Sequence, residues 1–95
     1  MKVKVHYISL VKTFTKASQD EFDLTQATAL SDALDKVADK YGKPFTAEVY
    51  DPQQGEIKPT FVAMVNGIHM DQLKGVNTPL KDGDNVILMS LVTGG

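Results

Sequence analysis

The first eleven residues alternate between polar and apolar side chains. Val3, Val5 and Tyr7 share one face at a period of two, and polar side chains occupy the other. This pattern predicts a half-buried strand over Met1–Val11. A polar stretch over residues 13–19 is expected to form a turn. Glu21–Leu24 is then a short second strand that makes a hairpin with the first.

A helical period follows. Six apolar residues fall at i, i+3, i+4, i+7, i+8 and i+11, which is the stripe of an amphipathic helix: Leu30, Ala33, Leu34, Val37, Ala38 and Tyr41. Thr28 is the expected N-cap residue. Gly42 suits the left-handed position that ends a helix, and Pro44 prevents the same helix from continuing.

The second half of the chain contains two further strand patterns. Lys43–Pro59 is irregular, but its apolar residues favour a packed segment, and Asp51–Gly55 has the composition of an exposed turn. Thr60–Val65 predicts a strand, which Asn66-Gly67 ends with a typical hairpin dipeptide. Residues 73–80 are predicted to form a loop and residues 81–84 a tight turn. The final strand is predicted over Asn85–Thr93, with apolar residues on both faces.

Together these elements predict one domain over residues 1–95. The order β-β-α-β-(short β)-β predicts an α+β fold in which one main helix packs on a mixed sheet of four to five strands. The simplest arrangement places the first and last strands side by side in the middle of the sheet. That arrangement is the ubiquitin-like β-grasp. A flexible tail is expected from about residue 92 to residue 95.

Composition excludes several classes of function. The 95 residues carry a net charge of -2, which argues against nucleic acid and anionic membrane surfaces as partners. The chain has no cysteine, so it has no disulfide, thiolate metal site or nucleophilic thiol of its own. No signal peptide or membrane-length apolar run is visible, so a cytoplasmic location is expected.

Common catalytic and metal-binding patterns are also missing from the sequence. There is no phosphate-binding glycine loop and no nucleophile elbow. His6 and His69 lack metal-ligand spacing, and both are expected to face solvent. Asp82 and Asp84 are more readily explained as turn-shaping residues than as a pair of catalytic carboxylates.

The unusual feature is the final pair, Gly94-Gly95. At average glycine usage, a terminal Gly-Gly arises by chance about once in 200 chains. Without side chains, such an end can enter a narrow channel and approach another backbone closely. Its carboxylate is ionised at neutral pH and is a poor electrophile until it is activated, typically as an acyl-adenylate. Nothing in this chain has a recognisable ATP site, so a partner must supply the activation.

The two central strands also predict a docking surface. If Val3, Val5 and Tyr7 face the helix, apolar residues on the opposite sheet face join into one exposed patch, and such a patch usually marks an interface. These residues are Ile8, Leu10, Ile87, Met89 and Leu91. The alternatives are that Lys43–Pro59 covers the patch or that the chain self-associates.

At this point several segments resemble one family. The opening strand, the helix entry Thr28–Leu34, the run Val65-Asn66-Gly67 and the stretch Thr78–Val86 (TPLKDGDNV) are similar to the MoaD/ThiS-like sulfur carriers. The ending Val92-Thr93-Gly94-Gly95 matches their V-[AST]-G-G tail. The closest resemblance is to the small subunit of molybdopterin synthase. Ser90 and Leu91 replace a Pro-Pro pair that is frequent in the family, which restores a backbone donor.

The resemblance implies a sulfur carrier in molybdopterin biosynthesis rather than an enzyme acting alone. An E1-like adenylyltransferase, which supplies ATP and magnesium, would activate Gly95 and allow its conversion to a thiocarboxylate. The tail, with Gly94, Val92 and Thr93, would then enter the large subunit of molybdopterin synthase, whose side chains complete the sulfur transfer. The carrier itself is expected to hold no cofactor stably and no metal.

Three alternatives remain open from the sequence. The chain resembles carriers for thiamine or cysteine synthesis nearly as well. A different class is a ubiquitin-like protein modifier, in which Gly95 would form an isopeptide bond with a lysine. A β-grasp binding module with an accidental Gly-Gly is the third.

Overall fold

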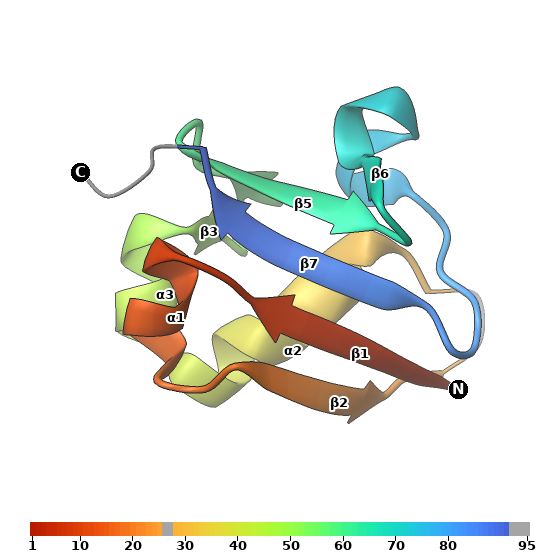
Figure 1. Ribbon diagram of the computed structural model, residues 1–95, viewed down its shortest axis with the longest axis horizontal. Helices are drawn as coiled ribbons and strands as arrows, with labels where there is room; N and C mark the ends of the chain where they lie inside the picture. The colour runs from red at the N-terminus through yellow and green to blue at the C-terminus, as the bar shows by residue number, and fades with distance from the viewer. Residues whose placement is uncertain (26–27, 92–95) are drawn as a thin grey trace.

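A computed structural model describes residues 1–25 and 28–91, in which five strands form the main sheet and a long helix crosses one face (Figure 1). The elements, in chain order, are β1 (Lys2–Tyr7), α1 (Leu10–Thr15), β2 (Gln19–Asp23), α2 (Leu30–Tyr41), α3 (Lys43–Glu48), β3 (Tyr50–Asp51), β4 (Glu56–Ile57), β5 (Phe61–Val65), β6 (Ile68–His69), the 3-10 turns η1 (Met70–Gln72) and η2 (Gly75–Asn77), and β7 (Asn85–Ser90).

The main sheet has the strand order β2-β1-β7-β5-β6. β1 and β7 run parallel in the centre, with Val5 opposite Val86 and Tyr7 opposite Leu88. β2 pairs antiparallel with β1, and β5 pairs antiparallel with β7. The predicted ubiquitin-like β-grasp and its central pair are therefore confirmed. β3 and β4 form a separate small hairpin.

The core lies between α2 and the inner face of the sheet. Val3, Val5 and Tyr7 are buried there, as their alternation predicts. The apolar stripe of α2 covers them, and Leu34 and Val37 are fully buried. α2 covers the inner face, and in Figure 1 no helix of residues 1–25 and 28–91 crosses the opposite, outer face, so apolar residues there have no covering helix.

The first strand is shorter than predicted, because it ends at Tyr7 rather than at Val11. Ser9 adopts a left-handed φ of 58°, which turns the chain out of the strand. The helix α1 then takes up the end of the predicted strand and the first three residues of the predicted polar turn. Val11 and Thr15 are buried and Phe14 is half-buried, which is an i, i+3, i+4 pattern of one helical face.

The ends of α2 differ in detail from the prediction. Ala29, not Thr28, is the N-cap residue, and the Asp32 carboxylate accepts a hydrogen bond from its N–H at 2.7 Å. Asp32 caps the helix from its third position, so no hydroxyl is needed at the cap. Gly42 ends α2 with a φ of 68°, as predicted. Pro44 then stands in the first turn of α3, where its missing N–H costs no helical bond.

The segment 43–59 is packed, as its apolar residues indicate. Phe45, Val49 and Tyr50 are buried in the core. α3 lies against α2 and α1 rather than over the outer face of the sheet. Residues 51–55 form the predicted turn, in which Gly55 N–H donates to the Asp51 carbonyl at 2.8 Å.

The hairpin between β5 and β6 depends on two left-handed residues. Asn66 and Gly67 have φ values of 52° and 83°, as a tight hairpin of this hand requires. Because a side chain at Gly67 would be strained, Gly67→Ala is expected to lower the free energy of unfolding by about 1 kcal/mol. Urea denaturation measures this loss. Gln54→Ala, in an exposed turn without positive φ, is the control, and an unchanged midpoint for Gly67→Ala would contradict the expectation.

Candidate functional site

On the outer face of the sheet, one row of side chains crosses four strands. His6 of β1 lies opposite Ile87 of β7. Ile87 lies opposite Met64 of β5, and Met64 lies opposite His69 of β6. The row therefore has two apolar side chains in its centre and a histidine at each end. Ile87 and Met64 are both partly exposed.

A second apolar row lies beside the first. Met89 of β7 pairs with Val62 of β5, and Ile8 N–H donates to the Leu88 carbonyl at 3.0 Å, which holds Ile8 at the level of Met89. Val62 is buried although it takes no part in the main core, so it lies beneath its neighbours on the outer face. We call Ile8, Val62, Met64, Ile87 and Met89 the sheet-face patch.

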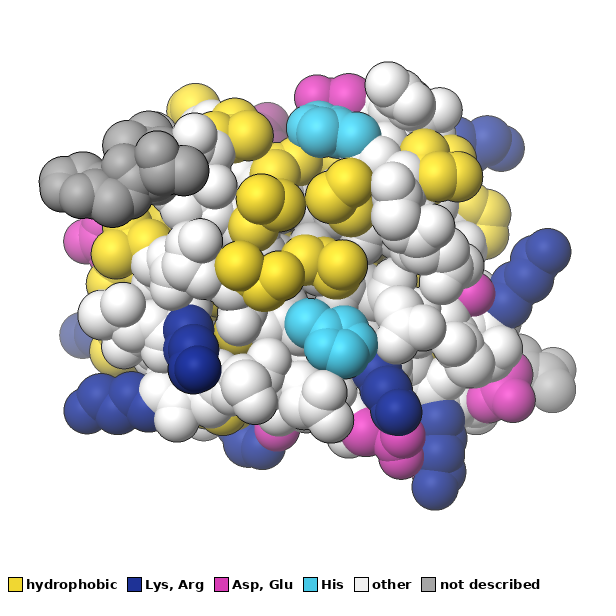
Figure 2. Space-filling view, viewed as in Figure 1, with side chains coloured by type: hydrophobic (Ala, Val, Ile, Leu, Met, Phe, Trp, Pro, Cys, Tyr) yellow, Lys and Arg dark blue, Asp and Glu magenta, His cyan; other side chains and the backbone are white. Residues whose placement is uncertain are grey.

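Figure 2 shows hydrophobic side chains gathered over the middle of this face, between the two histidines. His6 Nε2 lies 3.1 Å from Asn85 Oδ1, and His69 Nδ1 accepts a hydrogen bond from the Asp71 N–H at 3.1 Å. The histidines are thus tied to polar neighbours at the rim. The centre of the patch holds only aliphatic and thioether groups. Removing such groups from water by contact with a partner is favourable in free energy.

Two of the predicted patch residues lie elsewhere than the strand pattern implies. Leu10 is 47% exposed, but it begins α1 and does not lie on the outer face of β1. Leu91 is 58% exposed and follows the last residue of β7. Val62 and Met64 were not predicted as patch residues. The sequence feature that indicates them is the run Thr60–Val65, in which both odd and even positions are apolar, so that both faces of the strand are apolar.

The predicted carrier terminus begins directly beyond this face. The N–H of Leu91 donates to the Thr60 carbonyl at 2.8 Å, so the chain stays attached to the start of β5 one residue past β7. A proline at position 91 would lack this donor. Ser90 is buried. Val92, Thr93, Gly94 and Gly95 lie outside the described residues, as does the predicted flexible tail.

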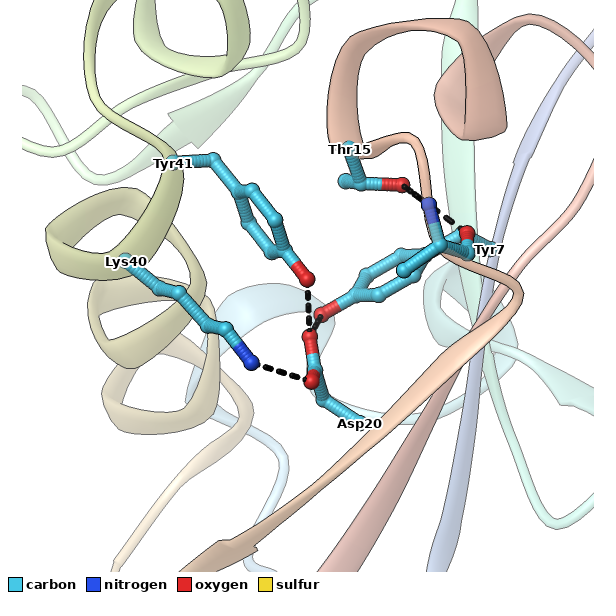
Figure 3. Close-up of polar contacts among 6 residues, drawn as sticks. Tyr7, Thr15, Asp20, Lys40 and Tyr41 are labelled. Carbon is cyan, nitrogen blue, oxygen red and sulfur yellow. Dashed lines mark hydrogen bonds and ion pairs between the residues drawn. The ribbon is translucent and has the colours of Figure 1, made fainter.

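A partly buried carboxylate ties β2 to the end of α2 beneath the sheet (Figure 3). Asp20 accepts hydrogen bonds from the Tyr7 hydroxyl at 2.9 Å and from the Tyr41 hydroxyl. The Lys40 ammonium group lies 2.5 Å from its other oxygen. The rings of Tyr7 and Tyr41 meet edge to face. Sequence reasoning did not identify this cluster.

The titration behaviour of the cluster is that of a structural network. Burial acts to raise the pKa of the Asp20 carboxyl, but hydrogen bonds from Lys40, Tyr41 and Tyr7 outweigh it and lower that pKa. Burial, and then the bond to Asp20, raises the pKa of the Tyr7 hydroxyl far above its ordinary value. The carboxylate therefore stays ionised and both of its oxygens are engaged, which leaves no free base or nucleophile.

The cluster gives a stability prediction. Asp20→Asn removes the charge that three donors share, and it is expected to lower the free energy of unfolding by about 2 kcal/mol at neutral pH, since bonds to charged groups contribute about 1.5–3 kcal/mol. Because folding lowers the pKa of Asp20, its stabilisation is present above the ordinary carboxyl pKa and is lost as the pH falls through the folded value.

Urea denaturation across a pH series measures this difference. The gap between wild type and Asp20→Asn should be constant near neutral pH and should shrink below about pH 4. Asp39→Asn, which alters an exposed carboxylate on α2, is the matched control. A gap that is absent at neutral pH, or that persists unchanged in acid, would contradict the role given to Asp20.

The acidic turn before β7 is structural, as predicted. The Asp82 carboxylate accepts a hydrogen bond from the Lys2 N–H at 2.7 Å. The Asp84 carboxylate accepts bonds from the Lys81 N–H at 2.7 Å and from the Asn66 side-chain amide at 2.9 Å. Among residues 1–25 and 28–91, no group of three or more histidine or acidic side chains is arranged to hold a metal ion. In the same residues, no helix has the length and apolarity needed to cross a bilayer.

Comparison with known proteins agrees with this architecture. The model of the ThiS family matches residues 5–95. No match was found among curated protein sequences.

Solved structures with the same fold include three relevant relatives. SAMP1 from Haloferax volcanii has a TM-score of 0.81 at 17% identity, with all of both chains covered. The putative molybdopterin converting factor, subunit 1, from Pyrococcus furiosus has a TM-score of 0.76 at 25% identity, covering 97% of this chain and 99% of that one. A chain of the BexX/CysO complex from Amycolatopsis orientalis has a TM-score of 0.72 at 19% identity, covering 98% and 99%.

Proposed function

The chain belongs to the ThiS family of ubiquitin-like sulfur carriers, and we propose from this that the carboxylate of Gly95 carries the sulfur as a thiocarboxylate. The observation that carries the proposal is that the family match extends through Gly94 and Gly95. A side-chain-free end suits entry into a partner's narrow active site. The chain has no cysteine, so a sulfur held on its side chains as a persulfide is not an alternative.

The activation of Gly95 has two chemical steps, and both take place in a partner's active site. A carboxylate oxygen of Gly95 attacks the α-phosphorus of ATP, and pyrophosphate leaves with the electrons of the broken P–O bond. The product is an acyl-adenylate, a far better electrophile than the carboxylate. A hydrosulfide ion supplied by a sulfur donor then attacks the acyl carbon, the C–O bond to AMP breaks so that AMP leaves, and loss of the sulfur-bound proton gives the thiocarboxylate. An E1-like adenylyltransferase would bind the ATP and magnesium.

The sheet-face patch would dock these partners. Two of its residues, Ile87 and Met89, lie on β7, the strand that precedes the C-terminal residues, so a partner seated on the patch would contact the strand that leads to Gly95. Met64 and Met89 suit a surface that meets an activating enzyme and an acceptor enzyme in turn, because methionine side chains repack easily. α3 lies against α2 and α1, away from this face.

For the acceptor, we propose the large subunit of molybdopterin synthase, which would pass the sulfur to a pterin precursor in the cytoplasm. The support is the run Thr78–Val86 together with the 25% identity to the converting factor subunit from Pyrococcus furiosus. The chain would then be the non-catalytic small subunit of a sulfurtransferase complex.

The test is to incubate the thiocarboxylated chain with that large subunit and a pterin precursor, and to follow the sulfur into product. Formation of a dithiolene pterin with loss of sulfur from the chain is expected. Parallel reactions with the enzymes of thiazole and cysteine synthesis, and a search for lysine conjugates, cover the alternatives. Sulfur transfer in one of these and not to the pterin would overturn the proposed acceptor.

A further inference from the structure

We propose that the open edge of β2, with the groove beside it, binds an extended lysine- or arginine-rich segment of another protein. β2 is the end strand of the main sheet, and β1 is its only strand neighbour among the described residues. In Figure 1 it forms the open edge farthest from β6. The inference goes beyond the proposed function, because it concerns a different edge and a different partner.

The hydrogen bonds to β1 determine which backbone groups of β2 are free to bind. The Ser18 carbonyl accepts from the Tyr7 N–H at 2.9 Å, and the Leu24 N–H donates to the Met1 carbonyl at 2.7 Å. Residues with even numbers therefore turn their backbone groups toward β1. The alternate residues Gln19, Glu21 and Asp23 point theirs toward the open edge, where they offer the repeating donors and acceptors that an added strand requires.

The groove beside the end of β2 supplies charge complementarity. A cavity of about 240 Å³ opens between β2 and α2. It is lined by Asp23, Leu24, Thr25, Thr28, Asp32, Asp35, Lys36 and Asp39. The lining carries four carboxylates and one lysine ammonium group, and the Met1 α-ammonium group lies 3.4 Å from Asp23, so the remaining negative charge favours a basic occupant. Asp35 is held in place by the Tyr50 hydroxyl at 3.0 Å, so the acidic wall is partly preorganised.

A second copy of this chain is a poorer occupant of the same edge. Pairing β2 with β2 would bring the exposed carboxylates of Glu21 and Asp23 against those of the other copy, and like charges across a strand pair are destabilising. A basic strand instead places its cations near these carboxylates. Phe22 is half-buried on the inner side and offers apolar contact to an alternate side chain of the partner.

The β2 edge is separate from the sheet-face patch. β1 lies between β2 and β7, and the groove opens toward α2 on the inner side of the sheet. A basic segment at the edge and an enzyme on the patch would therefore not compete for the same atoms. Absence of peptide binding at the β2 edge would therefore say nothing against docking of an enzyme on the sheet-face patch, and the reverse also holds.

The test uses an extended lysine–valine peptide that carries lysines on both of its faces, so that cations can reach Glu21 on the outer face and the groove on the inner side, and its control is a peptide with glutamate in place of each lysine. NMR titration of the full chain should shift the amide signals of residues 19–23 with the lysine peptide only. Raising the salt concentration should weaken this binding, because the groove is solvent-exposed. Glu21→Pro removes an outward N–H without touching the ladder to β1, since proline is tolerated at such edge positions.

Glu21→Pro is expected to weaken the peptide at least about tenfold, whereas Glu21→Gln, which keeps the N–H and loses the charge, should weaken it less. If Glu21→Pro unfolds the chain, a lysine–valine peptide with alternate N-methyl groups removes the complementary bonds, in which the peptide N–H groups donate to the outward carbonyls of β2. Absence of saturable binding would overturn the proposal. So would shifts confined to the sheet-face patch, or a concentration-dependent dimer in place of peptide binding.

Discussion

Deletion of Gly95 is expected to abolish sulfur loading completely while leaving the fold intact. Activation and thiolation both occur at the terminal carboxyl carbon, and a chain ending at Gly94 presents its carboxylate one residue, or about 3.5 Å, short of the reacting centre. A displacement of even about 1 Å from the productive geometry costs on the order of 100-fold in rate. The measurement is the intact mass after incubation with ATP, magnesium, an E1-like enzyme and a sulfur donor.

The control for this deletion is stability. Glycine has no side chain to bury, so the urea midpoint of the shortened chain is expected to equal that of the full chain. Gly95→Ala keeps the length and adds one methyl group, so it should load slowly rather than fail. Normal loading of the shortened chain would mean that the terminal residue is not the carrier site. An equal loss of loading and stability would mean that the deletion acts on the fold.

A charge in the sheet-face patch is expected to prevent docking. Ile8→Asp or Ile87→Asp places a carboxylate where a partner would exclude water, and an uncompensated buried charge costs about 3 kcal/mol or more. Affinity for the activating enzyme should therefore fall by more than about 100-fold. Isothermal titration calorimetry measures the change. Loading should fail at low enzyme concentration and recover in part at high concentration, because the terminus itself is unchanged.

Ile68→Asp is the matched control for this patch. Ile68 is 44% exposed and Ile8 is 42% exposed, but Ile68 lies on β6 and pairs with Val65, whose side chain is buried on the inner side. Its substitution should leave affinity within about twofold, as expected for a surface change outside an interface. An equal loss for both variants would show that general surface apolarity, and not the patch, drives binding. Unchanged affinity for Ile8→Asp and Ile87→Asp would show that the activating enzyme does not dock on the sheet-face patch.

The topology of the sheet could be predicted because the alternation in β1 and the helical stripe in α2 each specify one buried face. Once the buried face of β1 and the buried face of α2 are known, few arrangements of the strands around the helix bury both of them. The helix α1 was not predicted, because its apolar positions span little more than one turn and the preceding residues continue a strand pattern. The break depends on the left-handed backbone at Ser9, and serine gives no strong signal for that conformation.

The candidate site could be predicted only in part. Ile8, Ile87 and Met89 follow from the pairing of β1 and β7. Val62 and Met64 required knowledge that β5 lies beside β7, which leaves both faces of β5 apolar. In the Asp20 cluster, Tyr7 is 13 positions before Asp20 in the sequence and Tyr41 is 21 positions after it. Its donors and acceptor belong to β1, β2 and the end of α2, so no local spacing indicates it.

The most direct test of the carrier claim is the intact mass of the chain isolated from its native cells. A population is expected whose mass corresponds to replacement of one oxygen by sulfur, located at Gly95 by fragmentation and absent from the Gly95 deletion. An unmodified mass, in cells that contain a competent activating enzyme and an active sulfur donor, would contradict it. Lysine conjugates through Gly95 without any thiocarboxylate would assign the terminus to protein modification instead.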